Sequence, residues 1–229
     1  EYGSEYVTNY ELGWKTTTLD GRLRTSLAAF HMLYDNYQAT VATDPTNPAT
    51  AVTRNVDGTK INGVEGQVEL ALESWHFDMN FSYLDAKYGN LALFAPADLL
   101  GPVAPGTPPT AINLKGRRVS YAPEYSASIG ASYRLAAFGG ELTPSARVSY
   151  VDKQWVTFMQ APYNLLASRT LVDFRLDYQP VDADWSVQGF VTNLLGRKYA
   201  STLGSAAGNG FYGNAMLGAP RQFGRQVAR

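Results

Sequence analysis

The chain has 229 residues with 19 Lys and Arg against 20 Asp and Glu, and its formal net charge of −1 gives no sign of a nucleic-acid or other polyanion partner. Charged residues make up 17% of the chain and aromatic residues 13%, whereas soluble proteins carry about 25% charged residues. The absence of cysteine excludes disulfides and thiolate metal sites, and no apolar run reaches the roughly 18 residues of a transmembrane helix.

Segments that alternate apolar and polar residues recur along the whole chain, and this period of two predicts half-buried β-strands. No segment has helical periodicity. We expect about nine strands, at residues 7–16, 22–37, 64–72, 77–83, 125–133, 146–150, 172–178, 185–191 and from about 217 onward.

The segment 172–178 shows the alternation most clearly, because Val172, Phe174, Leu176 and Tyr178 oppose Asp173, Arg175 and Asp177. In the segment 22–37 the pattern is weaker, since apolar residues occur at both parities. There we expect Phe30, Met32 and Tyr34 to point outward.

The predicted connections alternate between short and long. Short ones are expected at 17–21, 73–76, 135–139 and 181–184, and long ones at 39–59, 89–120, 152–168 and 196–215. Compact soluble domains rarely use such long connections, whereas short turns at one rim and long loops at the other are typical of outer-membrane barrels.

The two faces of the predicted strands leave two interpretations. In a soluble sandwich the apolar face is the core, but in an outer-membrane barrel it contacts lipid and the polar face lines the lumen. Aromatic residues lie near the ends of the apolar faces, as in the girdles at the membrane interfaces. The pattern therefore favours an antiparallel transmembrane β-barrel over a soluble sandwich or barrel.

Two motifs near the C-terminus are similar to those of a known family. FVTNLLGRKYA (190–200) and GAPRQFG (218–224) resemble the last strands of TonB-dependent outer-membrane receptors. EYVTNYELGWKT (5–16), the stretch 19–38 and INGVEGQVELAL (61–72) resemble the family's mid-barrel strands, so the resemblance covers essentially the whole chain.

The resemblance implies that residues 1–229 are the C-terminal portion of a barrel of about 22 strands, located in the outer membrane of a Gram-negative bacterium. It implies TonB-driven uptake of a scarce nutrient, with a ferric siderophore as the expected small-molecule ligand and membrane lipid and the TonB complex as partners. The plug domain and the TonB-contacting segment are not recognised in this sequence. The chain also ends at Arg229, whereas family members usually end on an aromatic residue.

The sequence offers no constellation for catalysis, since its two histidines, His31 and His76, lack a recognisable Ser or Asp partner set. We expect no enzyme activity, no cofactor and no resident metal. Arg and aromatic residues of the long loops suit an anionic or catecholate-type iron chelate, and the best candidates are Arg117, Arg118, Trp155 and Tyr163. A passive porin-like or adhesin-like barrel is the alternative, a barrel enzyme is more remote, and the ligand cannot be read.

Overall fold

The computed structural model describes residues 2–44, 47–56, 58–90, 92–95, 107, 110–158, 160–204 and 214–228. These residues form antiparallel β-structure with one 3₁₀ turn, η2 (Pro162–Asn164), so the expected all-β fold is confirmed. None of the described segments is a helix long and apolar enough to cross a membrane.

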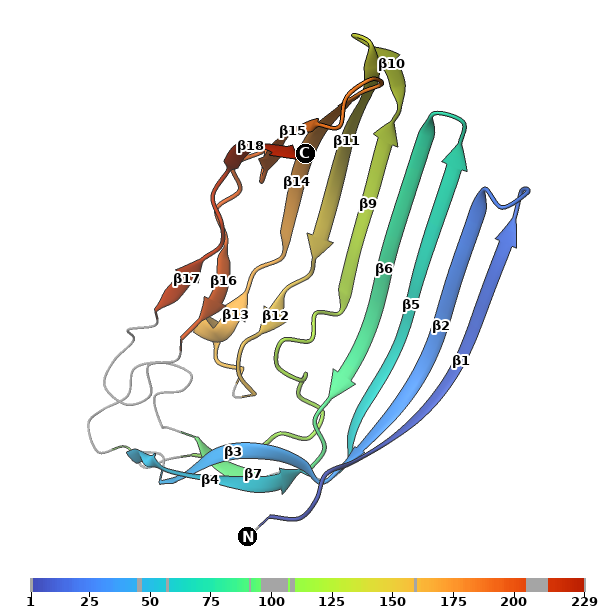
Figure 1. Ribbon diagram of the computed structural model, residues 1–229. Helices are drawn as coiled ribbons and strands as arrows, with labels where there is room; N and C mark the ends of the chain where they lie inside the picture. The colour runs from blue at the N-terminus through green and yellow to red at the C-terminus, as the bar shows by residue number, and fades with distance from the viewer. Residues whose placement is uncertain are drawn as a thin grey trace.

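One large sheet organises the chain (Figure 1). Each of its long strands pairs with the next long strand along the sequence, and β10 (Leu135–Ala137) adds a short pairing with β11. The long strands, in spatial order, are β1 (Tyr6–Thr18), β2 (Leu23–Asp35), β5 (Thr59–Leu72), β6 (Trp75–Lys87), β9 (Tyr125–Tyr133), β11 (Gly140–Val151), β14 (Arg169–Pro180), β15 (Ser186–Thr192) and β18 (Gln222–Ala228).

Four small hairpins occupy the long connections that the sequence analysis treated as loops. They are β3 (Tyr37–Asp44) with β4 (Asn47–Val56), β7 (Ala92–Ala95) with β8 (Thr110–Asn113), β12 (Gln154–Trp155) with β13 (Leu165–Leu166), and β16 (Ala200–Leu203) with β17 (Ala215–Leu217). The last strand was predicted from about Leu217, but Leu217 belongs to β17 and β18 begins five residues later, at Gln222. Residues 205–213 of the last long connection lie outside the described residues.

The short and long connections lie at opposite ends of the sheet. Figure 1 shows the short turns at the top and the hairpins of the long connections at the bottom, with the N-terminus on the long-connection side and the C-terminus on the other. At the first short turn, Leu19, Asp20 and Gly21 all have positive φ, which lets four residues reverse the chain.

The strand register divides the sheet into a polar face and an apolar face, because residues directly opposite in antiparallel strands share a face. One polar row runs Ser26, Gln67, Asn80, Ser128, Ser149. The neighbouring apolar row runs Val68, Met79, Ile129, Val148, Val172. We call these the inner face and the outer face.

The predicted orientation of Phe30, Met32 and Tyr34 is wrong. Phe30 pairs with Gly63 and therefore lies on the inner face with Glu65, while Leu27 and Leu33 lie on the outer face. The ring of Phe30 occupies the space above Gly63, where an added Cβ would collide with it. Because both parities of β2 carry apolar residues, only this pairing decides the orientation.

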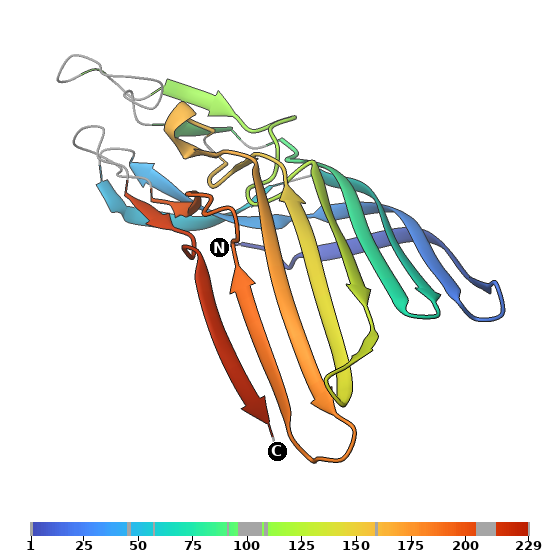
Figure 2. The same cartoon turned by 90° about the horizontal axis from the view of Figure 1, so that it is seen from above.

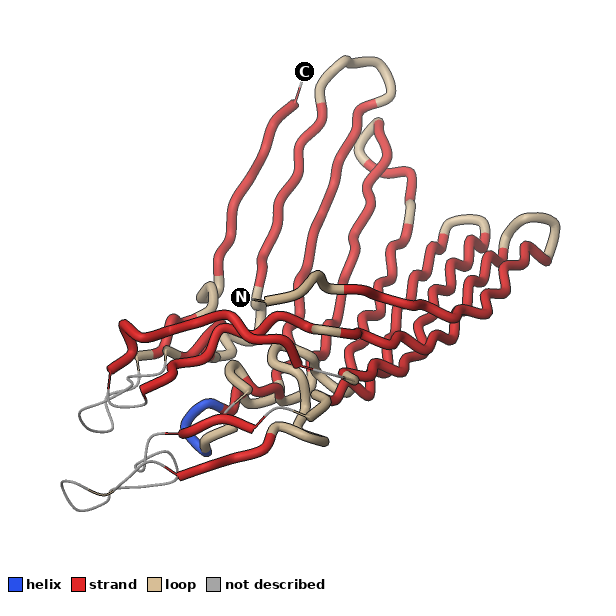
Figure 3. The backbone as a smooth tube through the Cα atoms, turned by 90° about the horizontal axis from the view of Figure 1, so that it is seen from below, coloured by secondary structure: helices blue, strands red, loops and turns tan. Residues whose placement is uncertain are grey.

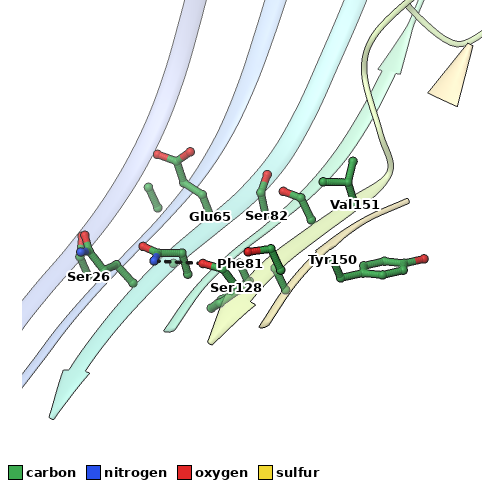
Figure 4. A pocket seen from close by; sticks show the side chains of 14 residues that line it. Ser26, Glu65, Phe81, Ser82, Ser128, Tyr150 and Val151 are labelled. Atoms are coloured by element: carbon green, nitrogen blue, oxygen red, sulfur yellow. Dashed lines mark hydrogen bonds between the residues drawn. The ribbon is translucent and has the colours of Figure 1, made fainter. Parts of the chain in front are cut away.

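The sheet is curled into an open trough with β1 and β18 at its two edges (Figures 2 and 3). The polar side chains line hollows along the inner face, and one of these hollows spans β2 to β11 (Figure 4). In Figure 4, Ser26, Glu65, Ser82 and Ser128 line this hollow from four different strands.

Cysteine labelling of neighbouring residues tests the two faces. Phe174 lies on the outer face and Arg175 on the inner face of the same strand. We expect a water-soluble, membrane-impermeant thiol reagent to modify Arg175→Cys and to leave Phe174→Cys unmodified in isolated membranes, because lipid covers the apolar face. Modification of position 174 alone would reverse the assignment of inside and outside.

Candidate functional site

The long-connection end of the sheet holds the buried part of this chain. Leu114 is fully buried and Tyr88 is 5% exposed, and Tyr37, Val119 and Phe158 pack against them with Ile112. The rings of Tyr37 and Tyr88 lie 5.8 Å apart. Burial, reinforced by the nearby Tyr88 hydroxyl, raises the pKa of Tyr37, so this phenol stays neutral. A small apolar core thus holds together residues from three long connections.

Tyr121 joins three long connections. Its backbone N donates to the Trp155 carbonyl oxygen at 2.8 Å, and its hydroxyl lies 2.6 Å from the Thr202 hydroxyl. The residue adopts φ 56°, a conformation that non-glycine residues rarely take. Gln160 adds a hydrogen bond from its side-chain amide to the Arg118 carbonyl oxygen at 2.8 Å. These contacts hold the connections together as one loop assembly, which we define as residues 110–124, 152–158, 160–168 and 200–204.

The two predicted arginines take different positions in this assembly. Arg118 forms an antiparallel bridge with Lys87, so its side chain shares the outer face with Lys87. Its guanidinium donates to a Glu124 carboxylate oxygen at 2.6 Å. Arg117 precedes this bridge and accepts a hydrogen bond from Tyr88 N at its carbonyl oxygen, 2.8 Å. By strand alternation, Arg117 lies on the opposite side of the backbone from Arg118.

Trp155 and Tyr163 both belong to the connection between β11 and β14. Trp155 is half-buried in β12 opposite Leu165, and Tyr163, in the turn η2, is 38% exposed. The adjacent Asn164 is 1% exposed, and its amide donates to the Thr157 hydroxyl at 3.0 Å. The structure therefore joins the connection of Trp155 and Tyr163 to that of Arg117, whereas the Arg118 side chain belongs to the outer face.

The inner wall of the sheet is a second polar region, and none of the predicted site residues lies on it. A hollow of about 490 Å³ is lined by Ser26, Glu65, Gln67, Asn80, Ser82 and Ser128, among others. A second hollow, about 620 Å³, is lined by Asp78, Arg147, Asp173, Arg175, Asp177 and Gln188 with their neighbours. The signal was present in the sequence, because these residues are the polar members of the alternating strands.

An ion pair crosses the second hollow. Arg147 binds both carboxylate oxygens of Asp78, at 2.8 and 2.9 Å, across the intervening strand β9. Gly130 is the residue opposite both partners, and a Cβ there would lie 2.9 Å from the Arg147 guanidinium. Glycine thus leaves the space in which the pair meets. Nearby, the Gln188 amide donates to Asp177 at 2.6 Å.

The groups of this wall are suited to polar binding. Its groups are carboxylates, guanidinium groups, amides and hydroxyls exposed to a wide hollow. Over the described ranges, no group of three or more His, Cys, Asp or Glu side chains is placed to hold a metal ion.

The motif NLLGR (193–197) closes the last long connection around the side chain of Asn193. The Asn193 amide donates to the carbonyl oxygens of Arg197 at 2.8 Å and Ala219 at 3.1 Å, and its side-chain oxygen accepts from Arg197 N at 2.8 Å. Its backbone N donates to Asp173 at 2.8 Å, which ties the motif to β14. Asn193 is 4% exposed, so these bonds are shielded from water.

The motif GAPR (218–221) packs against NLLGRKY. Gly218 lies against the ring of Tyr199, where any side chain would collide, and its N donates to the Tyr199 carbonyl oxygen at 2.9 Å. The Arg221 guanidinium lies over Gly196. Asn193 and Gly218 therefore join the end of β15 to the approach to β18, and the two motifs are parts of one structural clamp.

Comparison with known proteins gives a consistent result. The family model described as "TonB dependent receptor-like, beta-barrel" matches residues 2–194. The ferripyoverdine receptor of Pseudomonas aeruginosa is 27% identical over 228 residues, which cover 93% of this chain and 23% of that protein.

Solved receptor structures share the fold. The ferric yersiniabactin uptake receptor FyuA from Yersinia pestis superposes with a TM-score of 0.75 at 18% identity, covering 99% of this chain and 30% of that one. The siderophore receptor PiuA from Acinetobacter baumannii gives 0.68 at 20% identity, covering 96% and 27%. The chain therefore spans less than a third of the length of these proteins.

Replacing Asn193 tests the clamp. We expect Asn193→Ala in the full-length protein to lower the free energy of unfolding by about 1–3 kcal/mol, because buried donors and acceptors lose their partner. The matched control is Asn80→Ala, an exposed asparagine with one long 3.5 Å hydrogen bond to Ser128, expected to change stability by less than about 0.5 kcal/mol. Thermal unfolding in detergent measures both, and equal effects would contradict the role of the clamp.

Proposed function

The chain belongs to the TonB-dependent receptor β-barrel family, and from this premise we propose that it forms the C-terminal part of a receptor that takes up a ferric siderophore. The family consists of transport receptors, and TonB-dependent siderophore receptors are outer-membrane proteins of Gram-negative bacteria. Uptake in this proposal is driven through TonB and involves no catalytic step.

The proposed ligand class rests on the similarity of this chain to siderophore receptors. The ferripyoverdine receptor matches most of this chain in sequence, and the yersiniabactin receptor matches nearly all of it in fold. Ferric siderophores are metal chelates rich in oxygen donors. Arginine binds such anionic groups through charge-assisted hydrogen bonds, and aromatic rings stack on flat chelating groups.

Within the chain, we assign ligand capture to the loop assembly. Arg117, Trp155 and Tyr163 lie on two connections that Tyr121 holds together, so the groups that would touch the ligand start from a fixed base. Such a base lowers the entropy lost when a loop closes on its ligand. Arg118 lies on the outer face, so its side chain is not part of this assignment.

The inner wall serves the later part of transport in this proposal. Its row of serines, amides and paired charges offers hydrogen bonds to a polar body inside the barrel. The receptor's plug domain is the proposed occupant, and the segment that contacts TonB belongs to a part of the receptor outside residues 1–229. The alternative, a passive porin-like barrel, needs neither a plug domain nor a segment that contacts TonB.

Replacing whole connections in the full-length receptor tests the proposal. We expect substitution of residues 152–168, or of 89–120, by a short Gly-Ser linker to weaken binding at least about tenfold, because contacts of both connections are lost. The probes are ferripyoverdine, ferric yersiniabactin and a ferric catecholate. Surface display should persist, since pairing between the long strands is retained.

The control replaces the short turn 181–184 by the same type of linker and should leave binding unchanged. A cell without TonB should lose siderophore uptake whether it carries the wild type or a variant, and this loss distinguishes the receptor from a porin. Full affinity for a bound siderophore after both replacements, with intact surface display, would exclude the loop assembly from ligand capture.

A further inference from the structure

Three cationic residues stand side by side on the outer face of the sheet. Lys60 of β5 is directly opposite Lys87 of β6, and Lys87 in turn is bridged to Arg118. Residues opposite one another across antiparallel strands share a face. Tyr83 shares that face too, because it lies four residues before Lys87 on β6.

The carboxylates around this row do not balance it. Lys87 pairs with Asp85 at 2.9 Å and Arg118 with Glu124 at 2.6 Å. Lys60, in contrast, is exposed and has no carboxylate within 4.0 Å in the part of the chain that the structure describes. Like charges directly opposite in a sheet are destabilising, so Lys60 beside Lys87 favours an anion at this place.

Apart from Leu33, the other side chains near the row on the same face are polar. His31 and Asn62 occupy the neighbouring row, with the imidazole Nδ1 2.6 Å from the Asn62 side-chain oxygen. Leu33 is the residue opposite Lys60 on β2. The face therefore changes here from apolar to polar and basic.

The aromatic girdle gives the height of this row relative to the membrane. The rings of Tyr83 and Tyr125 pack 5.2 Å apart on the outer face, as interfacial tyrosines do. Lys87 lies four residues beyond Tyr83 on β6, which is about 13 Å along the strand. The distance along the membrane normal is shorter, because barrel strands are tilted. This distance places the cations at the level of the lipid headgroups.

We propose that Lys60, Lys87 and Arg118 form a binding site for a phosphate group on the headgroup of an outer-leaflet lipid. Arginine presents a planar fork of donors that matches phosphate, and lysine adds point charges. The site faces sideways into the membrane and continues upward from the lipid-contacting surface. A lipid phosphate is therefore favoured over free phosphate, and the inference extends beyond siderophore uptake.

Affinity for a phosphorylated lipid tests the site in the full-length receptor. The probe is diphosphorylated lipid A in mixed detergent micelles, compared with lipid A stripped of its phosphates and with inorganic phosphate. We expect Lys60→Gln/Lys87→Gln to weaken binding of the diphosphorylated lipid on the order of tenfold or more. Binding of the stripped lipid should not change.

The control is Lys15→Gln/Lys198→Gln, which removes the same charge from two exposed lysines, one in β1 and one in the last long connection. Heat-modifiable gel mobility checks that each variant is folded, and siderophore binding by both variants should match the wild type. Equal lipid affinity of the two double variants would overturn the site. Inorganic phosphate binding as tightly as the lipid would overturn the assignment to a lipid.

Discussion

The rest of this structure depends on one constraint, the pairing of backbone N–H and C=O groups in a medium without water. Strands that cross hydrocarbon must satisfy these groups with their neighbours, and the antiparallel order from β1 to β18 does so at every interior strand. Because hydrogen bonds between the backbones of neighbouring strands hold the sheet together, the side chains are not required to form a central core. The buried side chains accordingly gather where the long connections meet, around Tyr88 and Leu114, and not between the faces of the sheet.

This arrangement separates the chemistry of the protein into three regions. The outer face is apolar, with Trp75, Phe77 and Tyr133 packed on one another near the short turns. The inner face carries serines, amides and the Asp78–Arg147 pair. The long connections form the third region, in which Tyr121 joins segments from three parts of the chain. The proposed receptor function assigns the first region to lipid, the second to the polar interior and the third to the ligand.

Much of the fold could be predicted from the sequence, because period-two alternation reports directly on a sheet with two different faces. Val172 to Tyr178 was oriented correctly by this pattern alone. It failed for Phe30, Met32 and Tyr34, since β2 is apolar at both parities and its orientation depends on pairing with Gly63 and Ile61. Arg117 and Arg118 are both predicted as ligand-contacting residues of a long loop, and the sequence does not show that their side chains point in different directions. The bridge to Lys87 makes this segment strand-like, and adjacent residues then point to opposite faces.

The clamp around Asn193 was visible only as a family motif, because its partners Asp173 and Ala219 are distant in the sequence.

The central claim is that the apolar face of the sheet contacts lipid. It is tested most directly by quenching tryptophan fluorescence with brominated acyl chains in a bilayer that contains the full-length receptor. One variant retains Trp75 as its sole tryptophan, and another retains Trp155. Trp75 lies on the outer face at 46% exposure and Trp155 lies half-buried in the loop assembly. The account predicts strong quenching of Trp75 and little quenching of Trp155. Quenching of Trp155 with Trp75 unaffected would contradict it.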